Sequence, residues 1–492
     1  MTRRELAVEQ ETSVDEVDRI ARAAASAFHR AVAASDITRS SWLRAVADAI
    51  DARADDLVPV AEAETALDQI RLRGEVARTT GQLRLFANVI LEGSYLEAII
   101  DHAVPDAAPP RPDMRRFLRP IGPVAVFAAS NFPFAFSVAG GDTASALAVG
   151  CPVIVKAHSG HVQLSRLTAS IVRDALEGAG APEGLFAMVE GRGAGIALIE
   201  HPSIAAGAFT GSVHGGRALH DRAAARPAPV PFFGELGSAN PVVVTAAADS
   251  ARGVALARGL AGSFQLGAGQ FCTKPGLVFV PYHSALEATL PDHVGPPTRR
   301  LLTDAIDAGF RSGLAHLRAV PGVELVAEGS SGGSGPQTVV HAVGAATFSE
   351  PAFNSRLREE IFGPATLLVR YSSDVELRDS LATLDGSLTA TLHHESTDDI
   401  SAVLPLLEDR AGRVLFEGWP TGVSVTWSQH HGGPWPATTS QHTSVGATAV
   451  RRFQRPIVYQ DAPESVLPAA LKEMNPLRIP RRVDGKIGTP ND

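Results

Sequence analysis

Val124-Ala125-Val126-Phe127 is a short apolar run, and a stretch of small residues at 139–149 separates it from a second apolar run at 152–155. Short apolar runs of this kind are typical of buried strands, and the longer stretch between them predicts a helix. A strand, a helix and a further strand in this order are typical of a parallel sheet with helices packed on it. The segment therefore predicts an α/β fold.

The same alternation continues on both sides of Glu235. The expected elements are a helix at 164–177, strands at 186–189 and 208–210, then a strand at 240–245, a helix at 251–264 and a strand at 277–280. The repetition after Glu235 predicts a second α/β unit. The first hundred residues show helical periodicity instead, and the proline-rich residues 103–112 predict a linker or an extended arm.

Composition narrows the class of protein. The chain has 492 residues, 45% of them hydrophobic, enough for two to four domains with a large core. Its 44 basic residues against 53 acidic ones give a net charge of −9 without a basic stripe, which argues against a nucleic-acid partner. The sequence shows neither a secretory leader nor an apolar run that could span a membrane, and two cysteines suit a reducing compartment. We therefore expect a cytoplasmic protein.

Cys272 is the most informative single residue. The other cysteine, Cys151, begins an apolar run and is expected in the core. Cys272 instead follows the flexible stretch Gly267-Ala268-Gly269, which is typical of a loop. A thiol at such a place can be exposed, and its pKa is lowered if helix N–H groups face it. The ordinary alternative is a cysteine that only fills space in the core.

Two further polar residues suggest catalysis. Asn131 follows the strand at 124–127, so its amide is expected at the carboxyl edge of the sheet, where ligands of α/β proteins bind. Glu235 lies between Gly234 and Gly237 in an apolar context, and burial would raise its pKa and suit it to act as a general base. The alternatives are an asparagine in a turn and an ordinary loop glutamate.

Two segments could hold a dinucleotide. Gly211 and Ser212 follow a strand and Gly216 comes shortly after, and glycines let backbone N–H groups approach a pyrophosphate. The full G-x-G-x-x-G pattern is absent, so this signal is weak by itself. Glu360 could accept bonds from ribose hydroxyls with Phe362 against the sugar or nicotinamide, although Glu360 could equally form a structural salt bridge.

Taken together, these segments resemble the aldehyde dehydrogenase superfamily in order and spacing, from about residue 15 to about residue 460. The matching blocks are Ser130-Asn131-Phe132-Pro133, Val155-Lys156-Ala157, Phe209-Thr210-Gly211-Ser212, Glu235-Leu236-Gly237, Gly269-Gln270-Phe271-Cys272 and Glu360-Ile361-Phe362-Gly363-Pro364. The blocks at 79–87 and 136–148 look like the α-ketoglutaric semialdehyde (2,5-dioxopentanoate) dehydrogenase branch. NADP-linked fatty-aldehyde dehydrogenases share much of this pattern.

The resemblance implies a mechanism. Cys272 looks like the nucleophile that forms a thiohemiacetal and then a thioester, and Asn131 like the donor to the oxyanion. Glu235 resembles the base that activates water for hydrolysis of the thioester. Branches that pass the acyl group to coenzyme A generally lack this base, so Glu235 favours a carboxylic acid as the product.

The resemblance also implies a nicotinamide cofactor. Lys156 resembles the lysine that bonds the adenine ribose. Three residues later many NAD-preferring members carry Glu, which repels a 2′-phosphate, whereas this chain has Ser159. Ser159 can donate to a phosphate, and His158 either assists or is a surface residue. We therefore expect NADP to be preferred, with NAD possible.

Four side chains are expected along the substrate tunnel by position: Phe132, Phe136, Trp427 and His430. The two phenylalanines should lie on a helix. A keto-acid substrate also needs a cation for its carboxylate. The sequence does not choose this cation, and Arg115 and Arg116 are weak candidates. The histidines show no zinc-type spacing, so no metal is expected.

Other functions stay open at this point. The same chemistry could act on a longer aliphatic or aromatic aldehyde. A non-redox thiol hydrolase or acyl transferase would also use Cys272. A binding scaffold without catalysis has no chemical need for Cys272, Asn131 and Glu235 together.

The family's architecture implies a domain plan. Residues 1–101 and 121–236 would form a Rossmann-like cofactor domain, and residues 237–448 an α/β catalytic domain. Residues 102–120 and 449–475 would form a small bridging sheet between subunits of a homodimer or homotetramer, leaving residues 476–492 as a tail that is frayed at its end.

Overall fold

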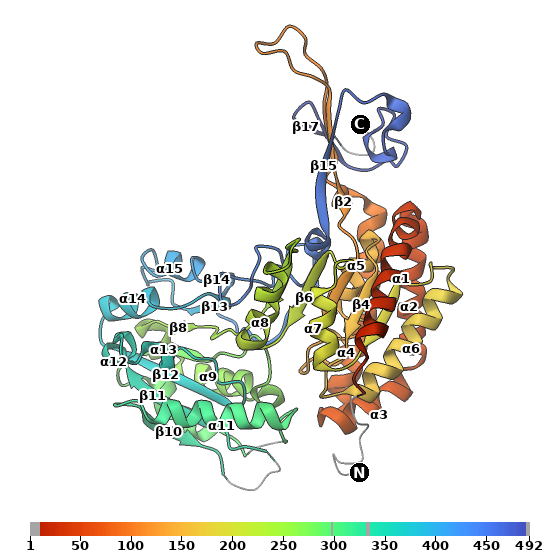
Figure 1. Ribbon diagram of the computed structural model, residues 1–492. Helices are drawn as coiled ribbons and strands as arrows, with labels where there is room; N and C mark the ends of the chain where they lie inside the picture. The colour runs from red at the N-terminus through yellow and green to blue at the C-terminus, as the bar shows by residue number, and fades with distance from the viewer. Residues whose placement is uncertain (1–9, 297–298, 331–334, 489–492) are drawn as a thin grey trace.

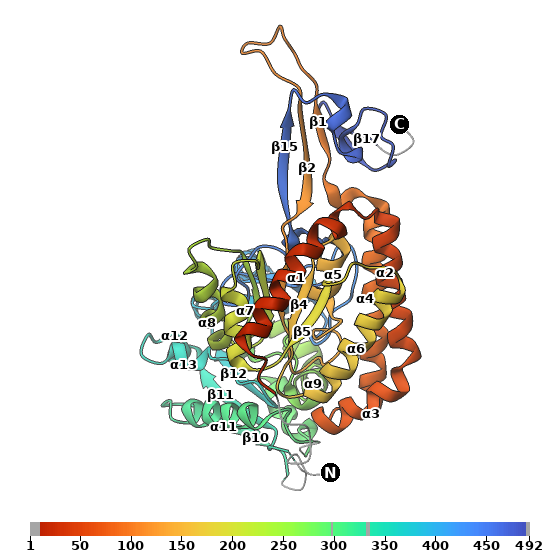
Figure 2. The same ribbon diagram turned by 45° about the vertical axis from the view of Figure 1, so that its right-hand side comes forward.

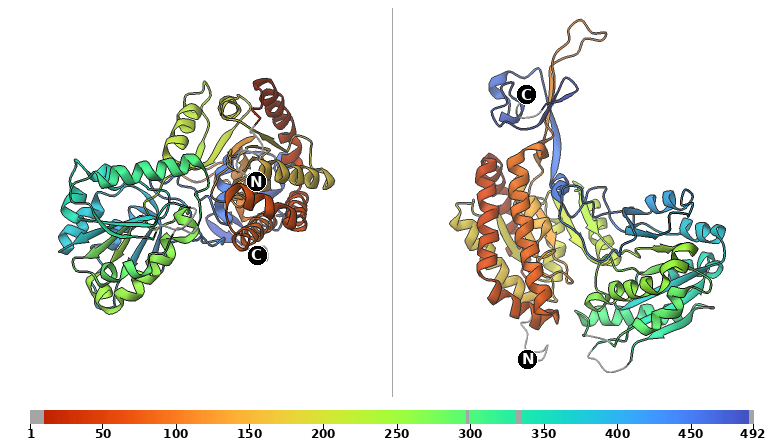
Figure 3. Two further views of the ribbon diagram at one scale, coloured as in Figure 1. Left: turned by 90° about the horizontal axis from the view of Figure 1, so that it is seen from below. Right: turned by 180° about the vertical axis from the view of Figure 1, so that it is seen from behind.

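The computed structural model describes residues 10–296, 299–330 and 335–488. Two α/β halves lie side by side, and an arm of strands projects beyond the first half (Figure 1). The view from behind in Figure 3 shows the same division. Each half is organised around one mainly parallel sheet, so the α/β class predicted from the sequence is confirmed.

The first sheet is parallel throughout. Its order is β5 (Phe186–Val189), β4 (Val153–Lys156), β3 (Val124–Phe127), β6 (Ala206–Thr210) and β7 (Phe232–Glu235). The chain runs outward from β3 to β4 and β5, and the later strands lie on the other side of β3. The order therefore reverses between β3 and β6, and the carboxyl ends of these two strands flank the crevice where α/β proteins bind ligands.

Helices cover both faces of this sheet because successive residues of a strand point to opposite sides. Val124 and Val126 pack into one hydrophobic cluster, and Ala125 and Phe127 pack into another. The first cluster includes α2 (Asp36–Ala52), α3 (Ala54–Thr65), α4 (Gln69–Glu92), α5 (Gly141–Val149) and α6 (Val162–Gly178). The second includes α1 (Val14–Ala33), α7 (Arg192–Glu200) and α8 (Val213–Ala224).

The second sheet is parallel except for its first strand, which pairs antiparallel with the next. Its order is β10 (Glu324–Glu328), β11 (Val339–Gly344), β12 (Ala365–Tyr371), β9 (Leu277–Pro281), β8 (Val242–Val244), β13 (Ser387–His393) and β14 (Ala411–Phe416). Its helices are α9 (Ala246–Phe264), α10 (Ala285–Thr289), α11 (Asp304–Arg318), α12 (Ala345–Ser349), α13 (Asn354–Leu357), α14 (Asp374–Ala382) and α15 (Leu404–Glu408).

The arm is a third sheet. Its order is β15 (Gln454–Gln460), β2 (Met114–Pro120), β1 (Ile99–Asp101), β16 (Arg481–Val483) and β17 (Lys486–Gly488), and Figure 2 shows β2 and β15 running alongside each other. Short 3-10 helices complete the chain: η2 (Ser94–Leu96), η3 (Leu266–Gly269), η4 (Leu290–His293), η5 (Ala447–Phe453), η6 (Glu464–Val466) and η7 (Ala469–Leu471).

The expectation of a frayed end was wrong for residues 481–488. This segment forms β16 and β17 because β1 offers it a free edge: Arg482 N donates to Ala98 O (3.0 Å) and Asp484 N to Ile100 O (2.9 Å). The last four residues of the expected tail, 489–492, lie outside the described residues.

No helix of the described residues combines the length and the apolar character that crossing a membrane requires.

A buried ion pair joins η5 to α5. Because η5 directly precedes β15, this pair also anchors the start of that arm strand to the first half. Arg452 Nη2 donates to Asp142 Oδ1 (2.7 Å), and the arginine side chain is 3% exposed.

We expect Arg452→Met to lower the free energy of unfolding by about 3–5 kcal/mol, because Asp142 is left as a buried charge without its partner. Urea denaturation followed by circular dichroism measures the loss. The control is Arg311→Met, which breaks an exposed pair with Asp307 and should cost less than about 1 kcal/mol. Equal losses in the two variants would contradict this role for the buried pair.

Candidate active site

The carboxyl edge of the first sheet collects the residues predicted from its strands. Asn131 follows β3, Gly211 follows β6 and Glu235 ends β7. The second half presents Cys272 to this edge from the loop that precedes β9. The candidate site therefore lies where the two halves meet.

The loop that carries Cys272 is tightly held. Gly267, Ala268 and Gly269 all have left-handed backbone angles, with φ of 60°, 57° and 69°. A Cβ on Gly269 would lie 2.1 Å from Gly363 O, so a larger residue does not fit there. Asn240 is fully buried, and its Nδ2 donates to two carbonyls of this loop, Cys272 O (2.8 Å) and Lys274 O (2.9 Å).

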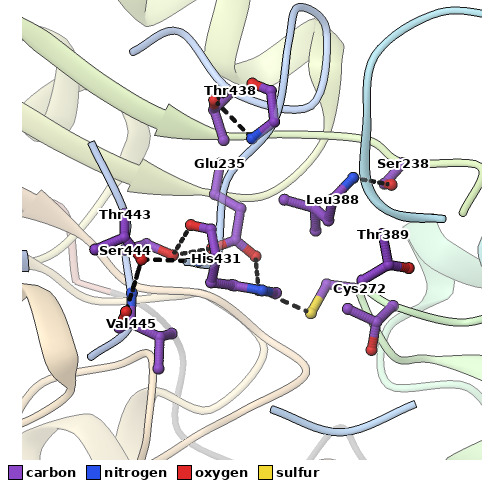
Figure 4. A network of polar contacts seen from close by, with 12 residues as sticks. Glu235, Ser238, Cys272, Leu388, Thr389, His431, Thr438, Thr443, Ser444 and Val445 are labelled. Carbon is purple, nitrogen blue, oxygen red and sulfur yellow. Dashed lines mark hydrogen bonds and ion pairs between the residues drawn. The ribbon is translucent and has the colours of Figure 1, made fainter. Parts of the chain in front are cut away.

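A histidine links the predicted nucleophile to the predicted base (Figure 4). His431 Nε2 lies 3.6 Å from Cys272 Sγ and 3.0 Å from Glu235 Oε1. The hydroxyl of Ser444 donates to the other oxygen of Glu235 (2.6 Å), and His431 N donates to Thr443 Oγ1 (2.7 Å). His431 is fully buried and Glu235 is 3% exposed. The three groups can therefore exchange protons away from bulk water.

The pKa of Glu235 is shifted in the direction opposite to the one predicted from the sequence. Burial by itself raises the carboxyl pKa, but the charge and hydrogen bond of His431 and the bond from Ser444 outweigh it. The pKa consequently lies below its ordinary value. Glu235 is thus an ionised carboxylate at neutral pH, ready to accept a proton.

The condition for a lowered Cys272 pKa, helix N–H groups that face the sulfur, is not met. Burial raises the pKa of this thiol well above its ordinary value, and the negative charge of Glu235 adds to the effect, while Arg78 acts against it. Cys272 lies in a turn after η3 rather than at the start of a helix, so it does not gain the stabilisation that helix N–H groups give a thiolate. The thiol needs a proton acceptor, and His431 is at contact distance.

Asn131 lies at the same junction. Its side chain is 8% exposed, and Nδ2 donates to Gln270 O (3.1 Å), two residues before Cys272. Its own carbonyl accepts from Arg71 Nη2 (2.6 Å). The amide is therefore placed beside the nucleophile's loop by contacts from both halves.

Phe132 and Phe136 form an apolar wall together with Phe271. The ring centroids of Phe132 and Phe136 are 5.4 Å apart, as are those of Phe132 and Phe271. The half-buried Cys272 packs against this cluster. A substrate chain that reaches the sulfur would lie along these rings.

The two phenylalanines do not lie on the expected helix. Residues 131–140 form turns, and α5 begins only at Gly141. A Cβ on Gly140 would lie 2.5 Å from Ala135 O, so the chain doubles back on itself more tightly than a helix permits.

Of the other two predicted tunnel residues, Trp427 is 49% exposed. The ring of His430 lies against Gly412 and Gly432. Neighbouring residues of an extended chain point to opposite sides. His430, the predicted residue, therefore points away from the sulfur, and His431 contacts it instead.

Arg115 and Arg116 lie on β2 in the arm. Arg115 forms an ion pair with Asp113 (2.9 Å), and Arg116 with Glu97 (3.5 Å). Because these acids already neutralise Arg115 and Arg116, neither arginine is a candidate for binding the substrate's carboxylate.

The predicted pyrophosphate segment has the shape that a dinucleotide requires. Gly211 and Ser212 connect β6 to α8, and the Ser212 hydroxyl caps the helix by accepting from Gly215 N (3.2 Å). A Cβ on Gly216 would lie 2.0 Å from Leu236 Cδ2, so this glycine allows the helix to pack closely on the sheet edge. A helix N-terminus at this edge suits a phosphate group.

The adenosine end of the predicted cofactor site lies after β4. Lys156 ends the strand and Ser159 is exposed. His158 Nδ1 accepts from Gly160 N (2.9 Å), and burial together with the charges of His161 and Lys156 lowers the pKa of His158 to about 3. His158 is therefore neutral at physiological pH and adds no positive charge here.

Glu360 and Phe362 come from the second half. Glu360 Oε2 accepts from Ser238 N (3.2 Å), near β7, and burial raises the pKa of this carboxyl while the charge of Lys274 lowers it. Lys274 Nζ donates to Ile361 O (2.8 Å) and so fixes the turn that carries Glu360. Phe362 is half-buried. The second half thus places Glu360 near the carboxyl end of β7 in the first sheet, with Phe362 two residues away.

Several contributors were not predicted from the sequence: His431, Ser444, Asn240, Lys274 and Arg78. The sequence signal that could have found His431 was the histidine pair before Gly432-Gly433, but the pair alone does not tell which ring points inward. The other four are typical surface or loop residues by type, and their roles depend on contacts between distant segments.

The site also has the composition of a cation site. Within the described residues, ligand atoms of Glu235, Cys272 and His431 all lie within 4.8 Å of one another. Carboxylate, thiolate and imidazole are ligands that zinc accepts. A cation bound there would occupy the nucleophile and the base together, so it would block the chemistry of a thiolate.

Comparisons with known proteins agree with this geometry. Residues 1–291 match the model of the aldehyde dehydrogenase family. Alpha-ketoglutaric semialdehyde dehydrogenase 2 of Azospirillum brasilense is 47% identical over 484 residues, covering 96% of this chain and 91% of that protein. Alpha-ketoglutaric semialdehyde dehydrogenase of Acinetobacter baylyi is 42% identical over 488 residues, covering 97% and 92%.

A solved structure supports the fold. The NAD-dependent aldehyde dehydrogenase from Sinorhizobium meliloti superposes with a TM-score of 0.75 at 25% identity, covering 92% of this chain and 87% of that one.

The electrostatics of Cys272 can be tested by alkylation. We expect the iodoacetamide reaction of the cofactor-free protein to have its pH midpoint above that of a free cysteine, about 8.5. Glu235→Gln removes a negative charge beside the sulfur and should move the midpoint to lower pH. Peptide mapping separates Cys272 from Cys151, whose burial raises its pKa to about 11.

Glu408→Gln, an exposed change, serves as the control and should leave the midpoint in place. An unchanged midpoint in Glu235→Gln would show that the carboxylate does not act on the thiol.

Proposed function

Because this chain belongs to the aldehyde dehydrogenase family, an NAD(P)-dependent group of enzymes, we propose that it oxidises 2,5-dioxopentanoate (α-ketoglutaric semialdehyde) to 2-oxoglutarate. The observation that carries the proposal is the contact of Cys272 with His431 and, through it, with Glu235. The substrate is suggested by the names of the two relatives that match almost the whole chain.

Acylation begins with the thiol of Cys272. His431 Nε2 donates to Glu235 Oε1 at rest, so the thiol proton moves to Nε2 only as the proton already there passes to Glu235, which holds it until it is released to solvent. The thiolate attacks the aldehyde carbon, a C–S bond forms, and the carbonyl oxygen becomes an oxyanion. The proposed donors to this oxyanion are Asn131 Nδ2 and the backbone N–H of Cys272. For this, Asn131 Nδ2 must give up its hydrogen bond to Gln270 O and donate to the oxyanion instead.

The residues at the sheet edge fit a dinucleotide. Ser212 and Gly216 would hold the pyrophosphate, Lys156 the adenine ribose, and Glu360 with Phe362 the nicotinamide ribose and ring. When bound, NAD(P) supplies a nicotinamide that accepts the hydride from the substrate carbon. The protein's part in this step is to keep the thiohemiacetal fixed by its bond to Cys272 and by the oxyanion donors.

Deacylation uses the same base. Glu235 is ionised and buried, so it can take a proton from a water molecule that attacks the thioester carbon. The C–S bond breaks, the carboxylic acid leaves, and Cys272 is regenerated. A base at this position makes hydrolysis the favoured fate of the thioester over transfer to coenzyme A.

We also propose that NADP is preferred over NAD. Ser159 is neutral and exposed next to Lys156, so the 2′-phosphate meets no carboxylate there. The neutral His158 contributes no charge, which leaves Lys156 as the cation of this segment.

A longer aldehyde is the second candidate substrate. The apolar wall of Phe132, Phe136 and Phe271 favours it, because such rings would pack on an alkyl chain. The ratio of kcat/KM for 2,5-dioxopentanoate to that for hexanal distinguishes the two. A ratio above 1 supports the semialdehyde, and a ratio below 1 supports the alkyl substrate.

The arm is the proposed contact between subunits of a cytoplasmic homodimer or homotetramer. β15 is an edge strand of the arm, with Val458 46% exposed, and edge strands invite pairing.

The base is tested by Glu235→Gln. We expect a burst of NADPH of about one equivalent per active site and then steady turnover reduced by roughly 100-fold or more, because hydride transfer precedes the step that needs the base. Stopped-flow absorbance measures both phases. Glu408→Gln should behave as the wild type. Unchanged steady turnover would contradict the role of Glu235 as the base in deacylation, and loss of the burst as well would show that acylation depends on the carboxylate too.

The cofactor preference is tested by Ser159→Glu. We expect the KM for NADP to rise by about 10- to 100-fold, because a carboxylate would repel the 2′-phosphate, while the KM for NAD changes little. Ser250→Glu, an exposed change on α9, is the control for added charge. Equal effects on both cofactors would refute the placement of Ser159 at the phosphate.

A further inference from the structure

Helix α4 presents two arginines to the apolar wall beside Cys272. Arg71 and Arg78 are seven residues apart, so they lie on one face of the helix. The guanidinium carbon of Arg71 lies 4.5 Å from the ring centre of Phe271, and that of Arg78 lies 5.3 Å from Phe136 and 5.5 Å from Phe132. Charged groups therefore border a surface that is otherwise apolar.

The two arginines differ in what they already bind. Arg71 Nη2 donates to Asn131 O (2.6 Å), so it supports the backbone of the proposed oxyanion donor. Arg78 Nε and Nη2 are buried and have no hydrogen-bond partner within the described part of the chain. No acid in that part lies within ion-pair distance of Arg78. A buried guanidinium without an acceptor is costly, which points to a ligand that completes it.

The nearest acid in sequence does not neutralise Arg78. Glu75 is fully enclosed on the same face of α4, but its Oε1 accepts from Phe134 N (2.9 Å) and Ala135 N (3.1 Å). This oxygen is thus directed at the turn that carries the phenylalanines, and Oε2 forms no hydrogen bond with Arg78. The charge of Glu75 favours the charged form of Arg78, but Nε and Nη2 keep no acceptor of their own in the described residues.

A chain of contacts connects Arg78 to the reacting atom. Arg78 lies over Phe136, whose ring centre is 6.3 Å from that of His431, and His431 Nε2 is 3.6 Å from Cys272 Sγ. Burial lowers the pKa of Arg78, and negative charges on Cys272, Glu75 and Glu235 act against this lowering. The guanidinium and the sulfur are therefore linked through Phe136 and His431.

We propose that Arg78 binds the carboxylate of the substrate by two charge-assisted hydrogen bonds and so selects short aldehydes that end in a carboxylate. The proposal rests on the function proposed above and supplies the cation that such a substrate needs. In 2,5-dioxopentanoate the carboxylate and aldehyde carbons are four bonds apart, about 5 Å when extended. In the proposed complex such a chain would lie along Phe136, with its carboxylate at Arg78 and its aldehyde at Cys272.

Arg78 also explains why a neutral aldehyde would be a poorer substrate. An alkyl chain in the same place leaves the guanidinium buried without an acceptor, and unpaired polar groups are the strongest means of rejecting an analogue. The aromatic wall alone would not discriminate between these substrates.

The test compares two aldehydes of five carbons, 2,5-dioxopentanoate and pentanal, in Arg78→Met. We expect the ratio of their kcat/KM values to fall by about 10- to 100-fold, chiefly through the KM for 2,5-dioxopentanoate. Any effect of Arg78 on the reactivity of Cys272 acts on both aldehydes and cancels in the ratio. Arg78→Lys should recover part of the preference, because it keeps the charge but not the paired donors.

The matched control is Arg73→Met on the same helix. Arg73 is exposed and pairs with Asp55 (2.8 Å), so its loss should leave the ratio as in the wild type. A ratio unchanged in Arg78→Met would overturn the proposal.

A binding measurement is independent of turnover. Calorimetric titration with the product, 2-oxoglutarate, should give about 10-fold or more weaker binding to Arg78→Met than to wild type, and equal binding would overturn the proposal. The proposed function fails separately: it fails if the wild type itself prefers pentanal. A wild type that prefers 2,5-dioxopentanoate, together with an Arg78→Met variant of unchanged ratio, would reject the arginine alone.

Discussion

The junction of Cys272, His431 and Glu235 is the constraint on which the rest of the structure depends. The sulfur comes from the loop before β9 in one half, and the carboxylate ends β7 in the other. His431 bridges them with contacts of 3.6 Å and 3.0 Å. Neither half alone carries both the proposed nucleophile and the proposed base, so the proposed mechanism requires both halves to be folded and docked.

Burial at this junction disfavours the charged forms of both Cys272 and Glu235. Burial raises the pKa of the Cys272 thiol and opposes ionisation of Glu235. Hydrogen bonds from His431 and Ser444 stabilise the carboxylate, and the same histidine contacts the sulfur. In the proposed mechanism the thiol is protonated at rest while the base is ionised. Proton transfer along one short path connects the two states.

How much could be predicted from the sequence depends on whether a residue's role is local. The buried strands lie where local patterns predicted them, and the structure brings Cys272 and Glu235 together. The raised pKa predicted for Glu235 was wrong because its carboxyl contacts His431 and Ser444, about 200 positions away along the chain. Arg78 gives no local signal, since an arginine on an amphipathic helix is usually exposed. The family resemblance predicted the chemistry, whereas the proposals for the proton path and for Arg78 required the packing of distant segments.

The most direct test is to detect the acyl group on the proposed nucleophile. The wild-type enzyme is mixed with 2,5-dioxopentanoate and NADP, quenched in acid within milliseconds, digested and analysed by mass spectrometry. The mechanism predicts a peptide in which Cys272 carries the 2-oxoglutaryl group, formed only when the dinucleotide is present and decaying as 2-oxoglutarate is released. Formation of 2-oxoglutarate while Cys272 stays unmodified at every time point would contradict it.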